Sequence, residues 1–337
     1  MPSIETIQLP LPHVGSVNAW LLRGDPLTLV DTGPRSAAAL DALERGLGAR
    51  GVRLEDIELV IGTHHHHDHV GLAATIRRRS GARLAVLDAA AQYAADYEAS
   101  VARDRRYAAE LMTAHGVPDE LLAPADALWD YIGRTSESFD ADIRLHDGGS
   151  IRAGGRDMRV IARAGHSATD TLLVDSGARV AFAGDHLLAK ISPNTEIYDA
   201  GTSRSRSRVA YLSGLKRTAR MPVECFLPGH GPPVIAAAAV VRRQLSQHRR
   251  RCRRIAQLIA QRPVSAFEVA RRMWSDAIVR EQPLLVLWEV LGLLDVMLDA
   301  GVAAEVQAQD GRPRFTLAGL RDGRPRSTGG QVLVDAR

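Results

Sequence analysis

The side chains best suited to chemistry are gathered in one short run, from Thr63 to His69. Four of them have ligand-like spacing: His64, His66, Asp68 and His69. Imidazole and carboxylate are good ligands for divalent transition metals, above all zinc. Four such groups on one loop can serve two ions, and two neighbouring ions can convert a bridging water into a hydroxide. A purification tag or a polar surface loop would also be rich in histidine, but tags lie at termini and lack the embedded aspartate.

Three more loops carry a potential ligand just past the end of a predicted strand, each behind a glycine that permits a tight turn. They are Gly165-His166-Ser167, Gly184-Asp185-His186 and Pro228-Gly229-His230-Gly231. A single histidine after a strand is more often structural. Three such loops beside a cluster of histidine and aspartate indicate one composite metal site.

These motifs resemble those of the metallo-β-lactamase superfamily. The match consists of His-x-His-x-Asp-His at 64–69, Gly-His at 165–166, Gly-Asp at 184–185, Pro-Gly-His-Gly at 228–231 and an early Asp-Thr-Gly turn at 31–33. The motifs come in the family's order and span roughly residues 1–240. The resemblance implies an α/β fold, the αβ/βα sandwich, with metals at one edge between the sheets. One departure, Ser167-Ala168-Thr169-Asp170 where family members often carry Thr-Pro-Gly, concerns the substrate loop and not the metals.

The resemblance also implies a ligand set for two metal ions. The first ion would be held by His64, His66 and His166, the second by Asp68, His69 and His230, and both by Asp185. Zn²⁺ is the expected metal, and iron and manganese are alternatives that the same ligand types accept. Asp31 is expected to anchor the loop that carries the first four ligands. His65 and His67 alternate with the ligands, so we expect them to point away from the metals in structural roles.

The rest of the sequence predicts how these residues are positioned. Strands alternate with helices before residue 88 and return at Ile143, which favours an α/β layer protein. Residues 88–140 have helical periodicity and predict a helical insertion that forms a lid. Beyond a long helix at 236–262, helices followed by two short strands indicate a winged-helix-like module. The predicted domains are a catalytic domain at 1–262, a winged-helix-like domain at 263–320 and a flexible tail at 321–337.

Composition narrows the class of protein. A hydrophobic content of 45% fits a globular chain. No apolar run reaches the length of a membrane span, and the N-terminus lacks the pattern of a secretory signal. Cys225 and Cys252 form no disulfide framework. We therefore expect a cytoplasmic enzyme without a membrane partner.

The ligand set favours a dinuclear hydrolase whose bridging hydroxide attacks the ester, thioester or lactone carbonyl of a small acyl substrate. Thioesterases and lactonases are among the enzymes that the resemblance includes. Asp68 is expected to orient the nucleophile and take a proton. Asn194 and Tyr198 are candidate hydrogen-bond donors to the substrate. Apolar side chains of the insertion could build an acyl pocket or simply pack the insertion onto the body.

Two other classes of function stay open. Metal pairs also suit RNA or DNA phosphodiesters, and seven arginines between Arg242 and Arg254 could contact phosphates. Against this stand a net charge of only +4 and an aromatic content of 4%. A regulator that senses a ligand through its metal domain is the other alternative. The apolar runs Leu284–Trp288 and Leu291–Leu294 could form an interface, so a homodimer is a further prediction.

Overall fold

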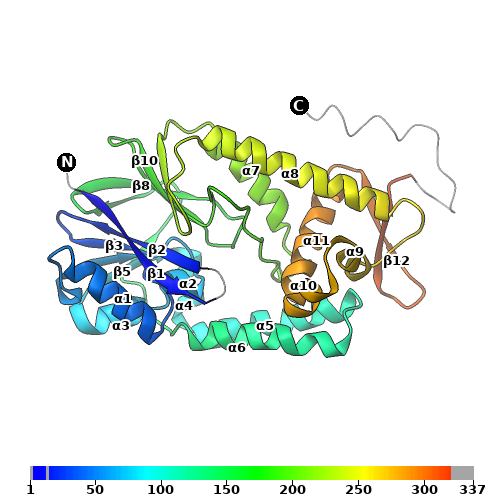
Figure 1. Ribbon diagram of the computed structural model, residues 1–337, viewed down its shortest axis with the longest axis horizontal. Helices are drawn as coiled ribbons and strands as arrows, with labels where there is room; N and C mark the ends of the chain where they lie inside the picture. Colours follow the sequence, from blue (N-terminus) through cyan, green and yellow to red (C-terminus); the bar gives the residue numbers. More distant parts are fainter. Residues whose placement is uncertain (1–2, 13–14, 320–337) are drawn as a thin grey trace. The chain divides into compact units, whose positions relative to one another are not determined.

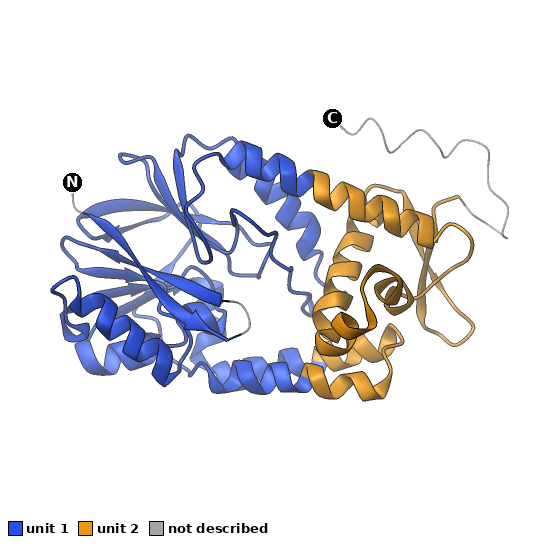
Figure 2. Cartoon of the chain, viewed as in Figure 1, with its two compact units in different colours: residues 1–106, 126–245 blue, residues 107–125, 246–337 orange. Residues whose placement is uncertain are grey.

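A computed structural model of the chain describes residues 3–12 and 15–319, so the tail predicted at 321–337 lies outside the described residues. The chain divides into two compact units (Figure 2). Unit 1 comprises Met1–Arg106 and Asp126–Leu245, and unit 2 comprises Tyr107–Ala125 and Ser246–Arg337. These bounds do not coincide with the predicted domains, whose boundaries stay a prediction.

The first of two large sheets in unit 1 has the strand order β1-β2-β3-β4-β5-β6 (Figure 1). Its strands are β1 (Ile4–Leu11), β2 (Gly15–Leu22), β3 (Thr28–Val30), β4 (Leu59–Ile61), β5 (Arg83–Leu87) and β6 (Ile143–Leu145). β3 and β4 run parallel, with Val30 opposite Ile61. Their carboxyl ends therefore lie at one edge of the sheet, where Asp31 and the loop from Thr63 to His69 follow.

The second sheet has the order β11-β10-β9-β8-β7. Its strands are β7 (Ser150–Ala153), β8 (Arg156–Ala162), β9 (Thr171–Asp175), β10 (Val180–Gly184) and β11 (Cys225–Pro228). β8 and β10 are both antiparallel to β9, and β11 is parallel to β10. Three carboxyl ends therefore meet at one edge, and they deliver the loops with His166, Asp185 and His230.

Helices cover the outer faces of both sheets, which confirms the predicted αβ/βα sandwich (Figure 1). On the first sheet, α1 (Ala37–Gly48) packs against β1, and Ser36 caps it by accepting from the amide of Ala39. On the second, α7 (Ser207–Thr218) buries Tyr211 and Leu215 in the sheet's hydrophobic core.

The segment predicted as a helical insertion, 88–140, is mostly helical. It contains α4 (Asp88–Ala95), α5 (Tyr97–Ala114) and α6 (Leu122–Arg134). The long helix expected after residue 236 is α8 (Ala237–Leu258), which stops before Pro263. No described helix combines the length and the apolar character that crossing a membrane requires.

Unit 2 contains, after α8, three helices followed by a hairpin. These elements are α9 (Ala266–Met273), α10 (Asp276–Glu281), α11 (Pro283–Asp299), β12 (Ala303–Gln307) and β13 (Pro313–Leu317). The capping box of Ser265 and Glu268 begins α9. Helices before a hairpin are the order that the winged-helix-like prediction requires, and that assignment stays a prediction.

The apolar runs expected to form a dimer interface lie in α11 and are mostly buried within the chain itself. Leu287, Leu291 and Leu294 have no exposed surface. A helix that is apolar on most sides belongs to a core, because only burial removes that surface from water. The interface assignment was therefore wrong for these runs, and the homodimer stays a prediction without their support.

The core of the second sheet yields a stability prediction. Phe226 in β11 is 0% exposed and packs with Leu172 and Tyr211. Phe226→Ala should lower the free energy of unfolding by about 3–5 kcal/mol, because it removes a buried ring and leaves a cavity. Ile235→Ala, at a side chain 78% exposed, should change it by less than about 0.5 kcal/mol. Chemical denaturation tests this, and equal losses in both variants would contradict the assigned core.

Candidate metal centre

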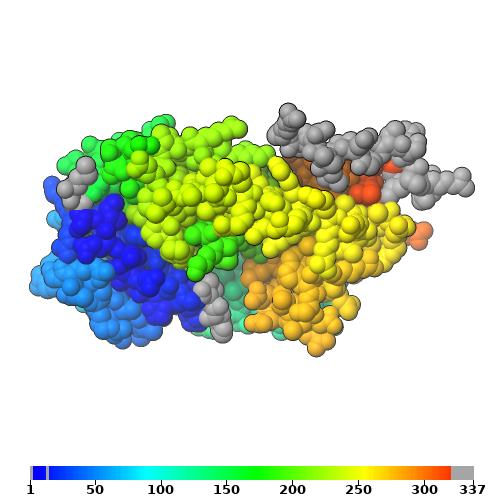
Figure 3. Space-filling view, turned by 45° about the horizontal axis from the view of Figure 1, so that its top comes forward, coloured from blue at the N-terminus to red at the C-terminus, as the bar shows by residue number. Residues whose placement is uncertain are grey.

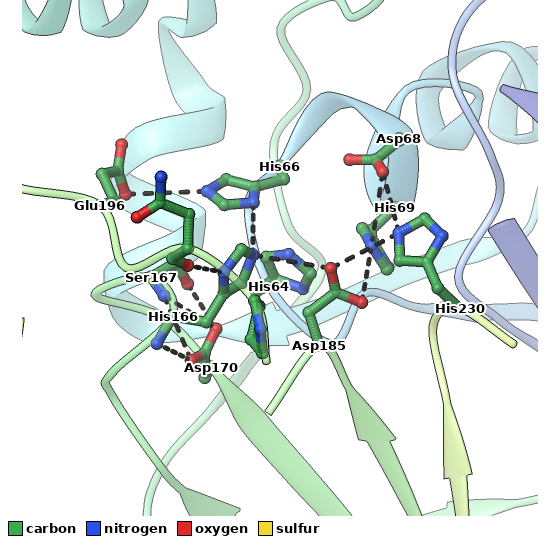
Figure 4. Close-up of polar contacts among 12 residues, drawn as sticks. His64, His66, Asp68, His69, His166, Ser167, Asp170, Asp185, Glu196 and His230 are labelled. Carbon is green, nitrogen blue, oxygen red and sulfur yellow. Dashed lines mark hydrogen bonds and ion pairs between the residues drawn. The ribbon is translucent and has the colours of Figure 1, made fainter. Parts of the chain in front are cut away.

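The structure brings together all seven side chains that the sequence predicted as metal ligands, and their role as ligands stays a prediction. Their nitrogen and oxygen atoms form overlapping groups within 4.8 Å: His64 with His66 and His166, His64 with His69 and Asp185, and Asp68 with His69 and His230. Figure 4 shows Asp185 between the pair His66 and His166 and the cluster of Asp68, His69 and His230. Four loops from two sheets therefore converge on one place.

Asp31 holds the histidine loop. It follows β3 in a left-handed conformation (φ 60°), which aspartate tolerates better than most residues. Its Oδ1 accepts from the amide of Thr63 at 2.8 Å, and its Oδ2 accepts from Thr63 Oγ1 at 2.9 Å and from His69 Nδ1 at 2.8 Å. This buried carboxylate has the anchoring contacts that we expected.

β2 of the first sheet holds the loop that carries His230. The side-chain amide of Asn18 donates to the carbonyls of Pro228 and Gly231 at 3.0 and 2.9 Å. The backbone amide of Asn18 donates to the carbonyl of Gly229 at 2.7 Å. These bonds join the ends of two sheets at the candidate site.

Hydrogen bonds fix which nitrogen of each imidazole faces the centre. His166 Nδ1 lies 2.7 Å from the carbonyl of Asn194, and His230 Nδ1 lies 2.8 Å from the carbonyl of Ser16. A carbonyl oxygen only accepts, so both Nδ1 atoms carry a proton. In each ring the other nitrogen, Nε2, is then left to bind a metal.

His64 and His69 have the same arrangement. His69 Nδ1 donates to Asp31, as described above. Thr63 Oγ1 gives its own proton to Asp31, so at 3.1 Å it accepts from His64 Nδ1. Within the described part of the chain, the buried atoms His64 Nε2, His69 Nε2 and Asp185 Oδ1 have no hydrogen-bond partner. Buried polar atoms are rarely left so, which fits a bound cation.

The ring of His66 has the opposite orientation, with Nδ1 and not Nε2 toward the centre. Its Nδ1 lies 3.0 Å from His166 Nε2, and its Nε2 faces the carboxylate of Glu196 at 3.7 Å. Two nitrogens directed at one point repel unless a proton or a metal ion lies between them. Their separation therefore also fits a cation at the first group of ligands.

The electrostatic balance of the second group favours a positive charge. Burial lowers the pKa of His69, but the carboxylates of Asp31, Asp68 and Asp185 raise it to about 10. Burial likewise lowers the pKa of His230, while Asp185 and Asp68 raise it to about 9. The carboxylates thus attract either extra protons or a metal ion that displaces them. With a donor set of nitrogen and oxygen, the residues fit divalent transition metals.

His65 and His67 are turned toward other neighbours, as expected. His65 packs on the ring of Tyr93, and its Nδ1 lies 2.9 Å from Thr169 Oγ1. Burial lowers the pKa of His65 to about 3, so this ring is neutral. His67 Nδ1 lies 2.8 Å from Thr135 Oγ1 in the segment after α6.

Two acidic residues beside the candidate ligands, Asp170 and Glu196, were not predicted from the sequence. Asp170 Oδ2 accepts from the amide of His166 at 2.7 Å, and its Oδ1 accepts from Ser167 Oγ at 2.7 Å. An aspartate in a short polar turn commonly accepts hydrogen bonds from that turn, so the position of Asp170 could have been predicted from the sequence. Burial would raise the pKa of Glu196, but the neighbouring imidazoles, that of His66 foremost, lower it to about 2. No local pattern marks Glu196, which lies in an irregular loop.

The two candidate substrate residues differ in their surroundings. Asn194 holds His166 through its carbonyl, and its side-chain oxygen accepts from the amide of Thr195 at 2.9 Å. Tyr198 is half-buried. Contact of either residue with a substrate stays a prediction.

The sequence matches the family model of the metallo-beta-lactamase superfamily over residues 13–230. The chain is 31% identical over 301 residues to a probable metallo-hydrolase, YqjP, of Bacillus subtilis, covering 86% of this chain and 91% of that protein. It is also 26% identical over 164 residues to a hydroxyacylglutathione hydrolase of Bradyrhizobium, covering 47% of this chain and 46% of that protein.

Two solved structures share the fold over nearly the whole chain. The metallo-beta-lactamase family protein TTHA1429 of Thermus thermophilus has a TM-score of 0.79 at 24% identity, covering 94% of this chain and 99% of that one. A beta-lactamase domain protein of Burkholderia ambifaria has a TM-score of 0.80 at 26% identity, covering 94% and 93%.

The hydrogen bonds of Asp31 predict that the variant Asp31→Asn binds metal more weakly. Asparagine tolerates the left-handed backbone, but its amide nitrogen cannot accept from Thr63 or His69. We expect metal affinity at the second group to fall about 10–100-fold, as for other groups that orient ligands. Competition with a chelator measures this. Asp56→Asn, at an exposed ion pair with Arg53, is the control, and wild-type affinity in Asp31→Asn would refute the anchoring role.

Gly229 lies close to the candidate ligands, so a side chain added at this position should weaken metal binding. A Cβ there would press on the His69 ring and lie 2.5 Å from Asp185 Oδ1. Gly229→Ala should therefore reduce metal content while the protein stays folded. Gly231→Ala is the matched control, since its Cβ would meet nothing within 4 Å and only its positive φ of 74° costs about 1 kcal/mol. Metal analysis that finds both variants fully loaded would contradict the packing of this loop.

Proposed function

The chain belongs to the metallo-beta-lactamase superfamily and is a metal-dependent hydrolase, and we propose that it uses two divalent ions to cleave an ester, thioester or lactone carbonyl. The position of Asp185 carries the dinuclear part of the proposal. Its Oδ2 lies 3.7 Å from His166 Nε2 in one group of ligands and 3.4 Å from His230 Nε2 in the other. One carboxylate that faces two groups is suited to bridging two ions.

The substrate class has separate support. One relative is a hydroxyacylglutathione hydrolase, and its named substrate is a thioester. The similarity to that protein covers 47% of this chain and so favours an acyl substrate without identifying it. We propose a small acyl compound as the substrate and Zn²⁺ as the metal, with iron or manganese as alternatives.

In the proposed reaction, seven residues would bind the metal ions and Asp68 would also orient the attacking water. The first ion would be held by His64, His66 and His166, the second by Asp68, His69 and His230, and both by Asp185. When bound, such ions lower the pKa of water and polarise the carbonyl oxygen of the substrate. Asp68, whose side chain is 13% exposed, can orient the attacking water and accept its proton. Its Oδ2 is held 3.3 Å from His230 Nε2.

The helical insertion has two interpretations. Tyr97 and Trp129 are buried, which favours the simple packing of these side chains. Tyr131 in α6 is half-buried and meets the ring of His67 edge-on, with ring centroids 5.2 Å apart. We propose that Tyr131 and Tyr198, rather than the buried aromatic residues, are available to an acyl group.

An alternative substrate is a phosphodiester of RNA or DNA. The observation that favours it is the exposure of arginines such as Arg249, Arg250 and Arg253 on α8, a helix visible at the surface in Figure 3. Basic side chains of this kind bind phosphates but also occur as solvated charge. The acyl proposal therefore stands first, and the substrate panel below includes this class.

The proposed function predicts chelator-sensitive hydrolysis of p-nitrophenyl esters, thioesters or lactones. Asp185→Asn and His66→Ala should each lower kcat/KM by about 100-fold or more, since even residues that only orient ligands cost 10–100-fold. Glu224→Gln, at an exposed ion pair with Arg179, serves as the control.

Two results would contradict this proposal. Full turnover by Asp185→Asn with lowered metal content would remove the bridging carboxylate from the mechanism. Cleavage of RNA or of bis-p-nitrophenyl phosphate, without cleavage of any acyl substrate, would show that the substrate is a phosphodiester and not a carbonyl compound.

A further inference from the structure

We propose that Glu196 is a positioning residue that fixes the ring of His66 with Nδ1 toward the metals. The inference rests on the proposed metal centre, and it assigns a role to a carboxylate outside the seven-ligand set. Figure 4 shows Glu196 on the side of His66 remote from Asp185.

Glu196 is buried and faces imidazoles. The residue is 8% exposed, and its Oε2 lies 3.7 Å from Nε2 of His66 and 3.7 Å from Nε2 of His65. A buried carboxylate is costly unless it is paired with hydrogen-bond donors or positive charge. Ring N–H groups of the two histidines can supply that compensation.

His66 needs an acceptor at this position. The other four candidate imidazoles direct Nε2 at the centre and donate from Nδ1 to a protein oxygen. His66 directs Nδ1 inward, so a neutral ring must carry its proton on Nε2, next to Glu196. At 3.7 Å the contact is electrostatic and longer than a hydrogen bond, so the proposed role requires the two side chains to approach each other when a metal is bound. A carboxylate in this position selects the tautomer and makes the ligand more basic.

The backbone holds Glu196 in place for this task. Its amide donates to the carbonyl of His166 at 2.9 Å, and the carbonyl of Asn194 accepts from His166 Nδ1 at 2.7 Å. The backbone of residues 194–196 therefore hydrogen-bonds to His166, while the carboxylate of Glu196 faces His66. A shift of this stretch would disturb two of the three ligands of the first group together.

A third cation is the rival explanation, because atoms of His65, His66 and Glu196 also lie within 4.8 Å of one another. If His66 bound metals through both nitrogens, its ring would have to lose both protons. Neutral imidazole with one nitrogen bound and the other donating is the usual arrangement in metal sites. The structure thus favours a hydrogen-bonded carboxylate, and the experiment below distinguishes the two.

The test is metal binding by the full-length protein, read without any substrate. The variants are Glu196→Gln, which keeps the shape but removes the charge, Glu196→Leu, which also removes the acceptor, and His65→Gln. Glu137→Gln, at a partly buried carboxylate paired with Arg78, is the matched control. Each is titrated with Zn²⁺ against a chelator and with Co²⁺ followed by its absorption spectrum, and thermal unfolding of the metal-free forms checks folding.

We expect Glu196→Gln to weaken binding at the first group about 10–100-fold and to alter the Co²⁺ spectrum, with a larger loss in Glu196→Leu. His65→Gln and Glu137→Gln should stay within about threefold of the wild type. Wild-type affinity and spectrum in both Glu196 variants would overturn the proposal. Three bound equivalents in the wild type, one of them lost in Glu196→Gln and in His65→Gln, would replace it by a third cation site.

The outcome is independent of the reaction. If the wild-type protein binds its metals but hydrolyses no acyl substrate, the proposed function fails while the assignment of Glu196 is still decided by the binding data. Conversely, active wild-type protein with unperturbed Glu196 variants would retain the proposed function and refute the role of Glu196.

Discussion

The candidate site depends on one constraint: each imidazole must give one ring N–H to a protein oxygen so that its other nitrogen can face a metal. The acceptors come from several parts of unit 1, including Asp31 after β3, Ser16 in β2 and Asn194 in the loop beyond β10. Without these bonds a histidine could rotate or take the other tautomer. The orientation of the candidate ligands therefore depends on the protein oxygens that accept these hydrogen bonds.

The fold supplies those oxygens because both sheets end at the same site. Parallel β3 and β4 bring Asp31 beside the histidine loop, while β8, β10 and β11 deliver the remaining ligands from the second sheet. Asn18 then ties the two together by binding the carbonyls of the His230 loop. Gly229 permits this close approach, since any side chain there would meet His69 and Asp185. Packing and metal chemistry thus constrain the same few residues.

The sequence predicted which side chains would come together as candidate ligands, because they are local signals: side chains of the right type placed just after strands. Apart from Asp31, it did not identify the groups that orient them. Substrate contact by Asn194 stays a prediction, while its backbone carbonyl holds His166, a role that any residue type could supply and that no side-chain pattern reveals. Glu196 comes close to His66 only through the path of an irregular loop. The apolar runs of α11 predicted an interface but are buried within the chain, since hydrophobicity alone does not say whether a helix is covered by its own chain or by a partner.

The most direct measurement is a crystal structure of the zinc-loaded protein with anomalous data at the zinc edge. We expect two ions with Asp185 between them, the first bound by Nε2 of His64 and His166 and by Nδ1 of His66, at about 2.0–2.1 Å. Nε2 of His66 should then face Glu196. A single ion, or an ion bound to Nε2 of His66, would contradict it.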